Sequence, residues 1–387
     1  MKQTRPGYNP LYFLVALGAG GLAVSFFVYI NFMVSHIGVP MATFEFIREA
    51  LFKGDWLSYV TGVALILVIV FAILHVKLLL WNIKEFKKFR GTEECKALLN
   101  SNGEVTLMAI PLTLAMSTNV AFVLGAIFIP ELWNYIEYLF PAALLAFATA
   151  GYFALKIFTN FFTRLLSTGD FDCNANNSLA QMISIFAFSM IAVGFAAPAA
   201  MSHTVWINAV GTIGAISFTT IAIALVVVKI VLGFKNMFER GVAPEASPSL
   251  WIMIPILTLL GITMVRVNFG FDHNFDTDVP KTYFFLLTTV VVSLQVLFGL
   301  LGYAVMKKLK YFETFIDGDK QSIPSFALIC PGVAFTVFWF FFVHFGLVQN
   351  GIVEQFSLVY FIVLLPILFI HGKTVYYFFK LKRKFSL

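Results

Sequence analysis

Charged residues are scarce in this sequence of 387 residues. Asp, Glu, Lys and Arg together make up 12% of the chain, whereas hydrophobic residues make up 60%. A chain with this composition must have lipid around most of its length, because it lacks the polar surface that water requires. The scarcity of charge therefore limits the function to a process in or across a membrane.

Residues suited to covalent or metal chemistry are also few. Three cysteines suggest no disulfide framework, and no pair of the six histidines has the helical spacing of a metal motif. The sequence lacks a phosphate-binding glycine loop and a nucleophile elbow, which argues against an ATP-driven pump. We expect no catalytic residue, metal or cofactor. A membrane enzyme or electron carrier that uses the scattered histidines stays an alternative, which an absorption spectrum would decide.

Ten apolar runs are long enough to cross a bilayer, which takes about 20 residues each. They lack the alternation of a membrane β-barrel, and no cleavage site follows the first run, so we expect ten retained helices. The predicted fold is all-α, with one transmembrane domain over residues 1–387. The predicted spans are 11–34, 56–81, 105–129, 134–158, 179–201, 206–232, 250–268, 282–305, 323–346 and 353–379.

The positive charge lies in every second connection. Of the 26 Lys and Arg residues, only Arg48, Lys53, Arg266 and Lys281 fall on the side away from the N-terminus. The positive-inside rule then predicts a multi-pass protein of the bacterial inner membrane with both termini cytoplasmic. The net charge of +6 is explained by this topology and by attraction to anionic lipid, so no nucleic-acid partner is expected.

Two connections between the spans stand out. Residues 82–104 form the longest cytoplasmic connection and are expected to continue the second helix before turning. Residues 41–54, on the outer side, have apolar residues spaced as in a short amphipathic helix on the membrane interface. A cap that packs on other loops fits the outer segment equally well.

A repeat distinguishes the odd-numbered spans. Met108–Thr113 in the third span reads MAIPLT, and Met253–Thr258 in the seventh reads MIPILT. Pro331 lies somewhat deeper in the ninth span, and proline frees a backbone carbonyl by breaking a helix hydrogen bond. We interpret the odd spans as an inner ring around a pathway, with the even spans facing lipid. Ordinary packing of kinked helices is the alternative.

The expected pathway is neutral at its centre and basic at its cytoplasmic mouth. No Asp or Glu lies inside any odd span, which favours anions over cations. Arg266 could attract anions at the outer mouth, but pairing with Asp272, Asp276 or Asp278 is the favoured interpretation. Phe335, close to Pro331, is the candidate for an aromatic gate. The predicted pore-lining residues are Gly18, Gly21, Pro111, Thr113, Ser117, Ser184, Pro255, Thr258, Cys330 and Pro331.

These features resemble the TehA-type tellurite-resistance and C4-dicarboxylate transporter family, which includes the plant slow anion channels. The resemblance implies five helical hairpins around a quasi-fivefold axis, a central pore lined by odd helices, and a homotrimer. It also implies a phenylalanine midway along the ninth span that closes the pore. Cys330 stands at that position, so either Phe335 or Phe326 replaces it, or the register of the match is shifted, or the protein gates and selects differently. The residues that carry the resemblance are Gly18–Leu22, Ala109–Thr113, Met253–Thr258 and the ninth span up to His344.

The function predicted from these features is a small-anion channel or channel-like transporter. Its expected partners are a small inorganic or carboxylate anion and membrane lipid. A coupled secondary carrier for C4-dicarboxylate, sulfite or tellurite-type oxyanions is the alternative, because the resembled family contains such carriers.

Overall fold

The structure, a computed structural model, describes residues 7–169, 178–275 and 277–387. Within these ranges the regular structure is helical, without any β-strand, and ten helices are long and apolar enough to cross a membrane. Their number and order are those predicted from the sequence. The helices that form these segments are α1 (Phe13–Met33), α3 (Trp56–Phe89), α5 (Ala109–Phe128), α6 (Leu132–Thr168), α7 (Ile183–Met201), α8 (Val205–Arg240), α9 (Met253–Phe275), α10 (Lys281–Lys308), α11 (Ile329–Phe341) and α12 (Leu358–Lys384).

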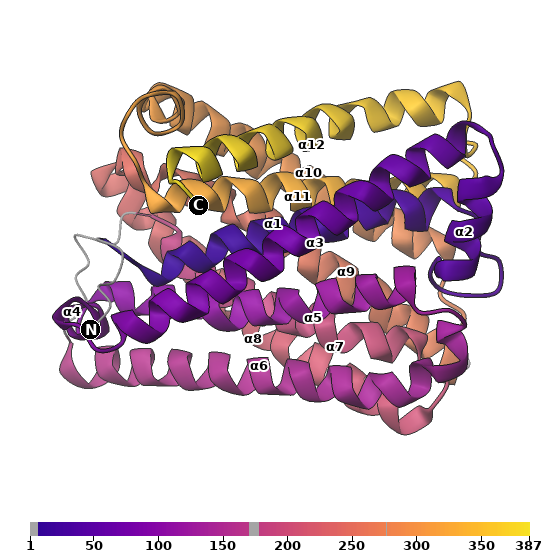
Figure 1. The fold of residues 1–387 in the computed structure, drawn as a ribbon. Coiled ribbons are helices and arrows are strands. Elements are labelled where there is room, and N and C mark those ends of the chain that lie inside the picture. The colour runs from indigo at the N-terminus through magenta and orange to yellow at the C-terminus, as the bar shows by residue number, and fades with distance from the viewer. Residues whose placement is uncertain (1–6, 170–177, 276) are drawn as a thin grey trace.

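The odd spans α1, α5, α7, α9 and α11 differ from the even spans in burial. In the most apolar stretch of each odd span, between 50% and 100% of the residues are buried, against 22% to 33% in the even spans. Helix α1 packs against α5 and α11, α7 packs against α5 and α9, and α9 packs against α11. Figure 1 shows the helices running side by side along the length of the molecule. The odd spans thus contact one another in a closed cycle, and the even spans expose their apolar side chains.

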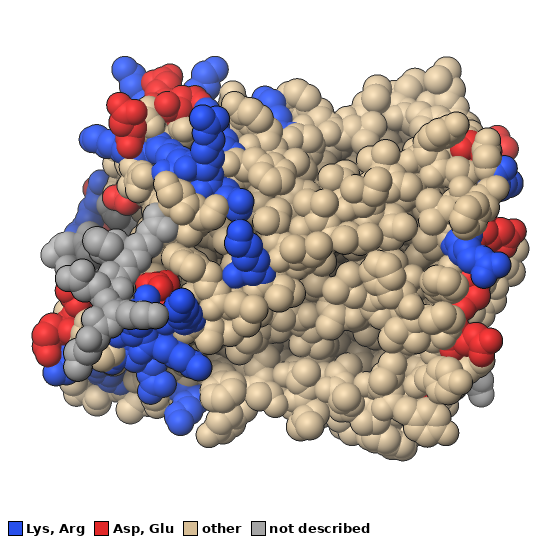
Figure 2. All heavy atoms as spheres, in the orientation of Figure 1, with Lys and Arg blue, Asp and Glu red and all other residues tan. Residues whose placement is uncertain are grey.

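The even spans are longer than the hydrocarbon core requires. Helix α3 has 34 residues, which corresponds to about 51 Å, against about 30 Å for the core. Figure 2 shows Lys and Arg gathered at one end of the molecule and a wide band without charge beside it. We call the end that carries Lys87, Lys88, Arg240 and the C-terminus the basic end. Helix α3 extends into this end as far as Phe89, as expected, and α4 (Glu93–Leu99) follows it.

Each odd span begins at the basic end as a 3₁₀ helix. Pro111, Pro255 and Pro331 are each the third residue of the α-helix that follows. Proline cannot donate a hydrogen bond to the carbonyl four residues back, so α-helical bonding stops there, and the tighter 3₁₀ bonding precedes it. Pro111 and Pro255 thus lie shortly after the start of their spans, as expected, and Pro331 holds the same position in α11 instead of a deeper one. The five segments are η1 (Pro10–Tyr12), η2 (Asn102–Met108), η3 (Ala180–Met182), η4 (Pro244–Ile252) and η6 (Ile323–Leu328).

The opposite end is closed in part by α2 (Phe44–Phe52), which lies within the segment 41–54. Its Ile47 and Ala50 are buried, and the Glu45 carboxylate accepts the backbone N–H of Glu131 from the connection between α5 and α6. Helix α2 thus packs on α3 and α5, and the Glu45 bond links it to the connection before α6. At the same end, the ninth span finishes with a π-helical segment, η7 (Phe342–Val348).

Helices α7, α8 and α9 approach most closely near Gly270. The Asn208 side chain of α8 donates to the carbonyl oxygens of Ala199 and Gly270, the latter at 3.2 Å. A Cβ atom on Gly270 would overlap the Ala199 carbonyl oxygen and lie 2.8 Å from the Asn208 amide nitrogen. Because that oxygen belongs to the backbone, it cannot move aside as a flexible side chain could.

We predict that Gly270→Ala lowers the midpoint of thermal unfolding of the purified protein in detergent. Overpacking of this kind costs about 1–3 kcal/mol. Gly372→Ala in α12 is the matched control, because a Cβ atom there meets nothing within 4 Å. Equal unfolding midpoints for the two variants would contradict the close approach at Gly270.

Candidate functional site

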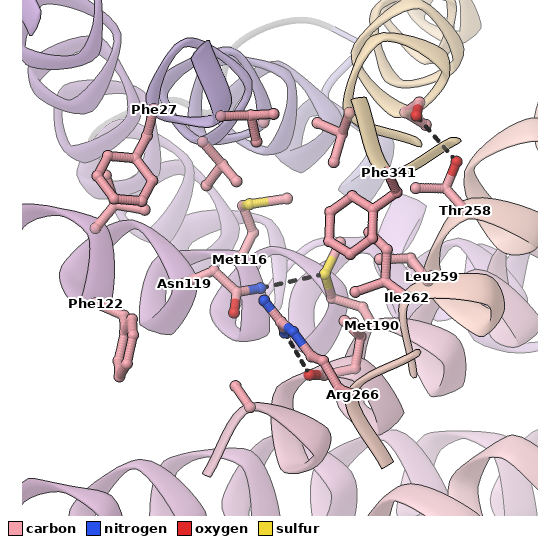
Figure 3. A pocket seen from close by; sticks show the side chains of 18 of the residues that line it. Phe27, Met116, Asn119, Phe122, Met190, Thr258, Leu259, Ile262, Arg266 and Phe341 are labelled. Carbon is pink, nitrogen blue, oxygen red and sulfur yellow. Dashed lines mark hydrogen bonds between the residues drawn. The ribbon is translucent and has the colours of Figure 1, made fainter. Parts of the chain in front are cut away.

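A cavity of about 270 Å³ lies between the five odd spans. Figure 3 shows Phe27 of α1, Phe122 of α5, Met190 of α7, Arg266 of α9 and Phe341 of α11 around it. Pro40 and Met41, from the connection before α2, also line it, so the cavity reaches toward the end opposite the basic end. We call it the outer cavity.

Arg266 is the one charged residue among the described residues that line the outer cavity. One of its guanidinium nitrogens, Nη1, donates to the Val193 carbonyl oxygen of α7 at 2.9 Å. Among the described residues, no carboxylate forms an ion pair with it. The expected pairing with Asp272 or Asp278 is therefore not formed, and Asp276 lies outside the described residues.

Other polar side chains of the outer cavity are neutral. The Asn119 side chain of α5 donates to the Met190 sulfur at 3.5 Å, which is a weak acceptor. Figure 3 shows the amide of Asn119 and the guanidinium of Arg266 pointing toward each other. Thr118 and Asn31 also line the cavity. The outer cavity is thus mostly apolar, with one charged group and a few neutral polar side chains from α1, α5 and α9.

A second cavity, of about 340 Å³, lies nearer the basic end. Its lining comes mainly from η4 and η6, with Leu11 of η1, Ala180 of η3 and the beginnings of the odd spans. Glu245, which is exposed, is the one charged residue among the described residues of this lining. The Lys and Arg residues of the basic end are not among the described residues of this lining, which we call the inner cavity.

Three residues line both cavities: Phe186 of α7, Pro255 of α9 and Cys330 of α11. All three are buried, and the exposed fractions of Phe186 and Cys330 are 5% and 8%. Among the described residues of the two linings, Phe186 is the one aromatic residue that both share. Its ring and the small Cys330 side chain border both cavities, which makes Phe186 the candidate for a closing ring.

The residues predicted from the sequence to line a pore fall into two groups. Gly18, Gly21, Pro255, Thr258 and Cys330 line the outer cavity, and Pro331 lines the inner one together with Pro255 and Cys330. The structure does not bring the remaining four to either lining. These are Pro111, Thr113, Ser117 and Ser184.

The hydroxyl groups of the second group already have partners within the protein. Thr113 donates to the carbonyl oxygen of Ala109 at 2.7 Å, and Ser184 donates to that of Gln181 at 3.0 Å. Ser117 donates to the carbonyl of Thr113 and lies 2.9 Å from Nε2 of His75. A hydroxyl that satisfies its own helix contributes no donor to a passing ion.

Phe335 lies in neither lining. Its ring packs on Trp339 one turn further along α11, with 5.3 Å between the ring centroids. Phe326, the other candidate, is completely buried against Tyr12 and Phe385. Neither ring is therefore placed at the boundary between the two cavities.

The buried histidines serve as hydrogen-bonding links between helices. His75 of α3 contacts the Ala16 carbonyl at 2.7 Å, and His371 of α12 contacts the hydroxyls of Ser25 and Tyr29. Among the described residues, no group of three or more His, Cys, Asp and Glu side chains could hold a metal ion.

Comparison with known proteins adds no assignment. No family model matches the sequence, and no curated protein matches it. The function must therefore be argued from the two cavities themselves.

Three residues of this site were not among the predicted pore-lining residues, although Arg266 was considered from the sequence as a residue that could attract anions at the outer mouth. Arg266 carried a signal, because an ionisable residue within a span is a candidate functional group by default. Asn119 carried a weaker one, as part of the polar run Ser117–Asn119 in an apolar span. Phe186 carried none, because it is one of 46 phenylalanines and only the packing of α7 against α5 and α9 directs it to the cavities.

We predict that N-ethylmaleimide modifies Cys330 slowly in the unaltered site and faster after Phe186→Ala, because the ring shields the thiol. The measurement is a time course of labelling by mass spectrometry, with Cys95 and Cys173 replaced by serine; Cys173 lies outside the described residues. Phe335→Ala is the control and should leave the rate unchanged. Equal rates in all three proteins would refute the shielding.

Proposed function

We propose that this protein is a channel-like transporter that lets small anions cross the membrane passively through the two cavities. The observation that carries the proposal is the guanidinium of Arg266, a cation without an acidic partner among the described residues, in the lining of an otherwise uncharged cavity. A charged side chain in the middle of a membrane helix costs about 2.5–3.5 kcal/mol, so such residues face water or a ligand.

The rest of the cavity lining is uncharged, so an anion that enters the cavity is not held too tightly to leave. Conduction requires that an ion bind well enough to enter a pathway and weakly enough to leave it. Arg266 shares its guanidinium with the Val193 carbonyl, whose partial negative charge moderates the attraction. A cation meets only repulsion from Arg266, whereas an anion meets attraction and the donor of Asn119.

The arrangement we propose is five hairpins whose odd helices surround the pathway. The closed cycle of contacts among the odd spans, with α1 packed on α11, supports it. The accumulation of Lys and Arg at the basic end supports a cytoplasmic placement of that end in a bacterial inner membrane. The resemblance to the TehA-type family supports the same arrangement and is the basis for proposing a homotrimer.

In this arrangement Phe186 is the closing element of the pathway. A change in the rotamer of one ring would join the outer and inner cavities without movement of a helix. A proton-coupled carrier would instead need a titratable group on the path. Among the described lining residues, only Arg266 and the exposed Glu245 are charged, which favours passive conduction over coupled transport.

We predict that the purified protein in planar bilayers passes nitrate and chloride in preference to potassium, and that Arg266→Gln reduces this preference. Loss of about 1.4 kcal/mol of attraction would reduce the anion-to-cation permeability ratio about tenfold. The measurement is the reversal potential in a salt gradient. Arg48→Gln is the matched control, because Arg48 is an exposed residue of α2 outside the cavity lining. Equal passage of anions and cations by the unaltered protein would refute the proposal.

We predict further that Phe186→Ala raises the anion conductance, because it removes the ring between the two cavities. A barrier lower by about 1.4 kcal/mol corresponds to about a tenfold increase in rate. Phe335→Ala, which removes an identical ring outside both linings, should conduct as the unaltered protein does. A larger increase for Phe335→Ala than for Phe186→Ala would show that the gate lies on α11.

A further inference from the structure

We infer that the outer cavity is a binding site for a monocarboxylate with a short apolar body. This inference rests on the proposed function, because it names the class of anion that the cavity selects. The carboxylate would be held by Arg266 and Asn119. The apolar body would lie among the side chains of α1, α5, α9 and α11.

The donors of the site are concentrated at one place. Nη1 of Arg266 is used by the Val193 carbonyl, and this is the only hydrogen bond of the guanidinium to the described residues. Within the described residues, the amide nitrogen of Asn119 has only the Met190 sulfur as an acceptor, at 3.5 Å. Figure 3 shows the two donor groups facing each other in the lining of the outer cavity, and the site we infer places one acceptor against both.

The geometry of these donors favours a planar group with two oxygen atoms. A guanidinium presents its N–H groups as a flat fork, which matches a carboxylate with two parallel hydrogen bonds. A spherical ion such as chloride can use only part of this fork. An amide N–H from Asn119 can then bond the outer lone pair of one carboxylate oxygen.

The charge of the site favours a monovalent anion. The described lining has one cation and otherwise neutral residues. The second charge of a dicarboxylate or sulfate would be removed from water without compensation, which is strongly unfavourable in an apolar site. The cavity therefore selects against the divalent oxyanions that a carrier of dicarboxylates would take.

The remaining surface favours a hydrocarbon body. Around the donors lie Phe27, Phe122, Leu259, Ile262 and Phe341, and the cavity volume of about 270 Å³ exceeds the needs of a small inorganic ion. Apolar contact of this kind contributes about 0.8 kcal/mol per buried methylene, which corresponds to about fourfold in affinity. Affinity should therefore rise with chain length until the cavity is full.

The test is calorimetric titration of the full-length protein in nanodiscs with formate, acetate, propionate, butyrate, benzoate, succinate and sulfate, with protein-free nanodiscs as the blank. We expect affinity to rise about fourfold for each methylene from acetate to butyrate, and succinate and sulfate to bind more weakly than butyrate. Arg266→Gln should weaken butyrate binding at least about tenfold and Asn119→Ala about fivefold. Arg48→Gln should leave it unchanged.

Arg266→Lys is the control for a loss of folding in Arg266→Gln. It keeps the positive charge but not the forked guanidinium, so this variant should bind butyrate better than Arg266→Gln does. Affinity that is independent of chain length, or succinate binding as tight as that of butyrate, would overturn the monocarboxylate site. Nitrate conductance in bilayers, measured on the same preparation, separates the two proposals. Conduction without graded carboxylate binding removes only this inference. Graded binding that requires Arg266, without conduction of any anion, supports the site and removes the channel.

Discussion

The need to satisfy every backbone hydrogen bond away from water is the constraint on which this structure depends. An unpaired N–H or C=O group in hydrocarbon costs several kcal/mol, so each crossing must be helical almost throughout. Proline is tolerated in the first turn of a helix, where its missing N–H would have no partner within the helix. Pro111, Pro255 and Pro331 occupy that turn. The 3₁₀ segments before Pro255 and Pro331, η4 and η6, bound the inner cavity at the basic end. Pro255 and Pro331 thus begin odd helices and also line the inner cavity.

The second constraint is the cost of a charge inside the membrane. Arg266 lies 13 residues after the first residue of α9, about 20 Å along the helix axis. Its helix could not hold it against lipid without a large penalty, and the cavity between the odd spans lowers that penalty because the guanidinium faces the cavity and bonds to the Val193 carbonyl. The cavity and the cation therefore require each other. An apolar cavity without Arg266 would not distinguish anions from cations. Arg266 without the cavity would be a charge placed against lipid without compensation.

The sequence predicts the parts of this fold that repeat and misses those that depend on one contact. Ten apolar runs and the alternation of charge are properties of long segments, so span number and order follow from them directly. The small residues Gly18 and Gly21 of α1 were also predicted to matter, and the structure shows that they let Ile329 and Val333 of α11 approach closely.

The position of a single aromatic ring cannot be predicted from the sequence in this way. Phe186 and Phe335 are equivalent in composition and in hydrophobicity, and only the rotation of α7 and α11 about their axes directs one of them to the cavities. Thr113 and Ser117 were predicted to line the pore because they carry polar atoms. Their hydroxyl groups already donate to carbonyl oxygens of their own helix, so they do not serve the cavity.

Two opposite charges stand at the ends of the candidate pathway. Arg266 faces the outer cavity, and Glu245 lines the inner one at an exposed position. An exposed charge is screened by salt within about 8–10 Å, whereas a charge in an apolar cavity is screened far less. Arg266 therefore dominates the field that an ion meets inside the membrane, and Glu245 acts only near the surface, where the Lys and Arg of the basic end oppose it. In the pathway we propose, selection by charge is a task of α9 and closure a task of α7, and these two helices are in direct contact. A site that separates these tasks can change its preferred anion through residues near Asn119 without altering the ring that closes it.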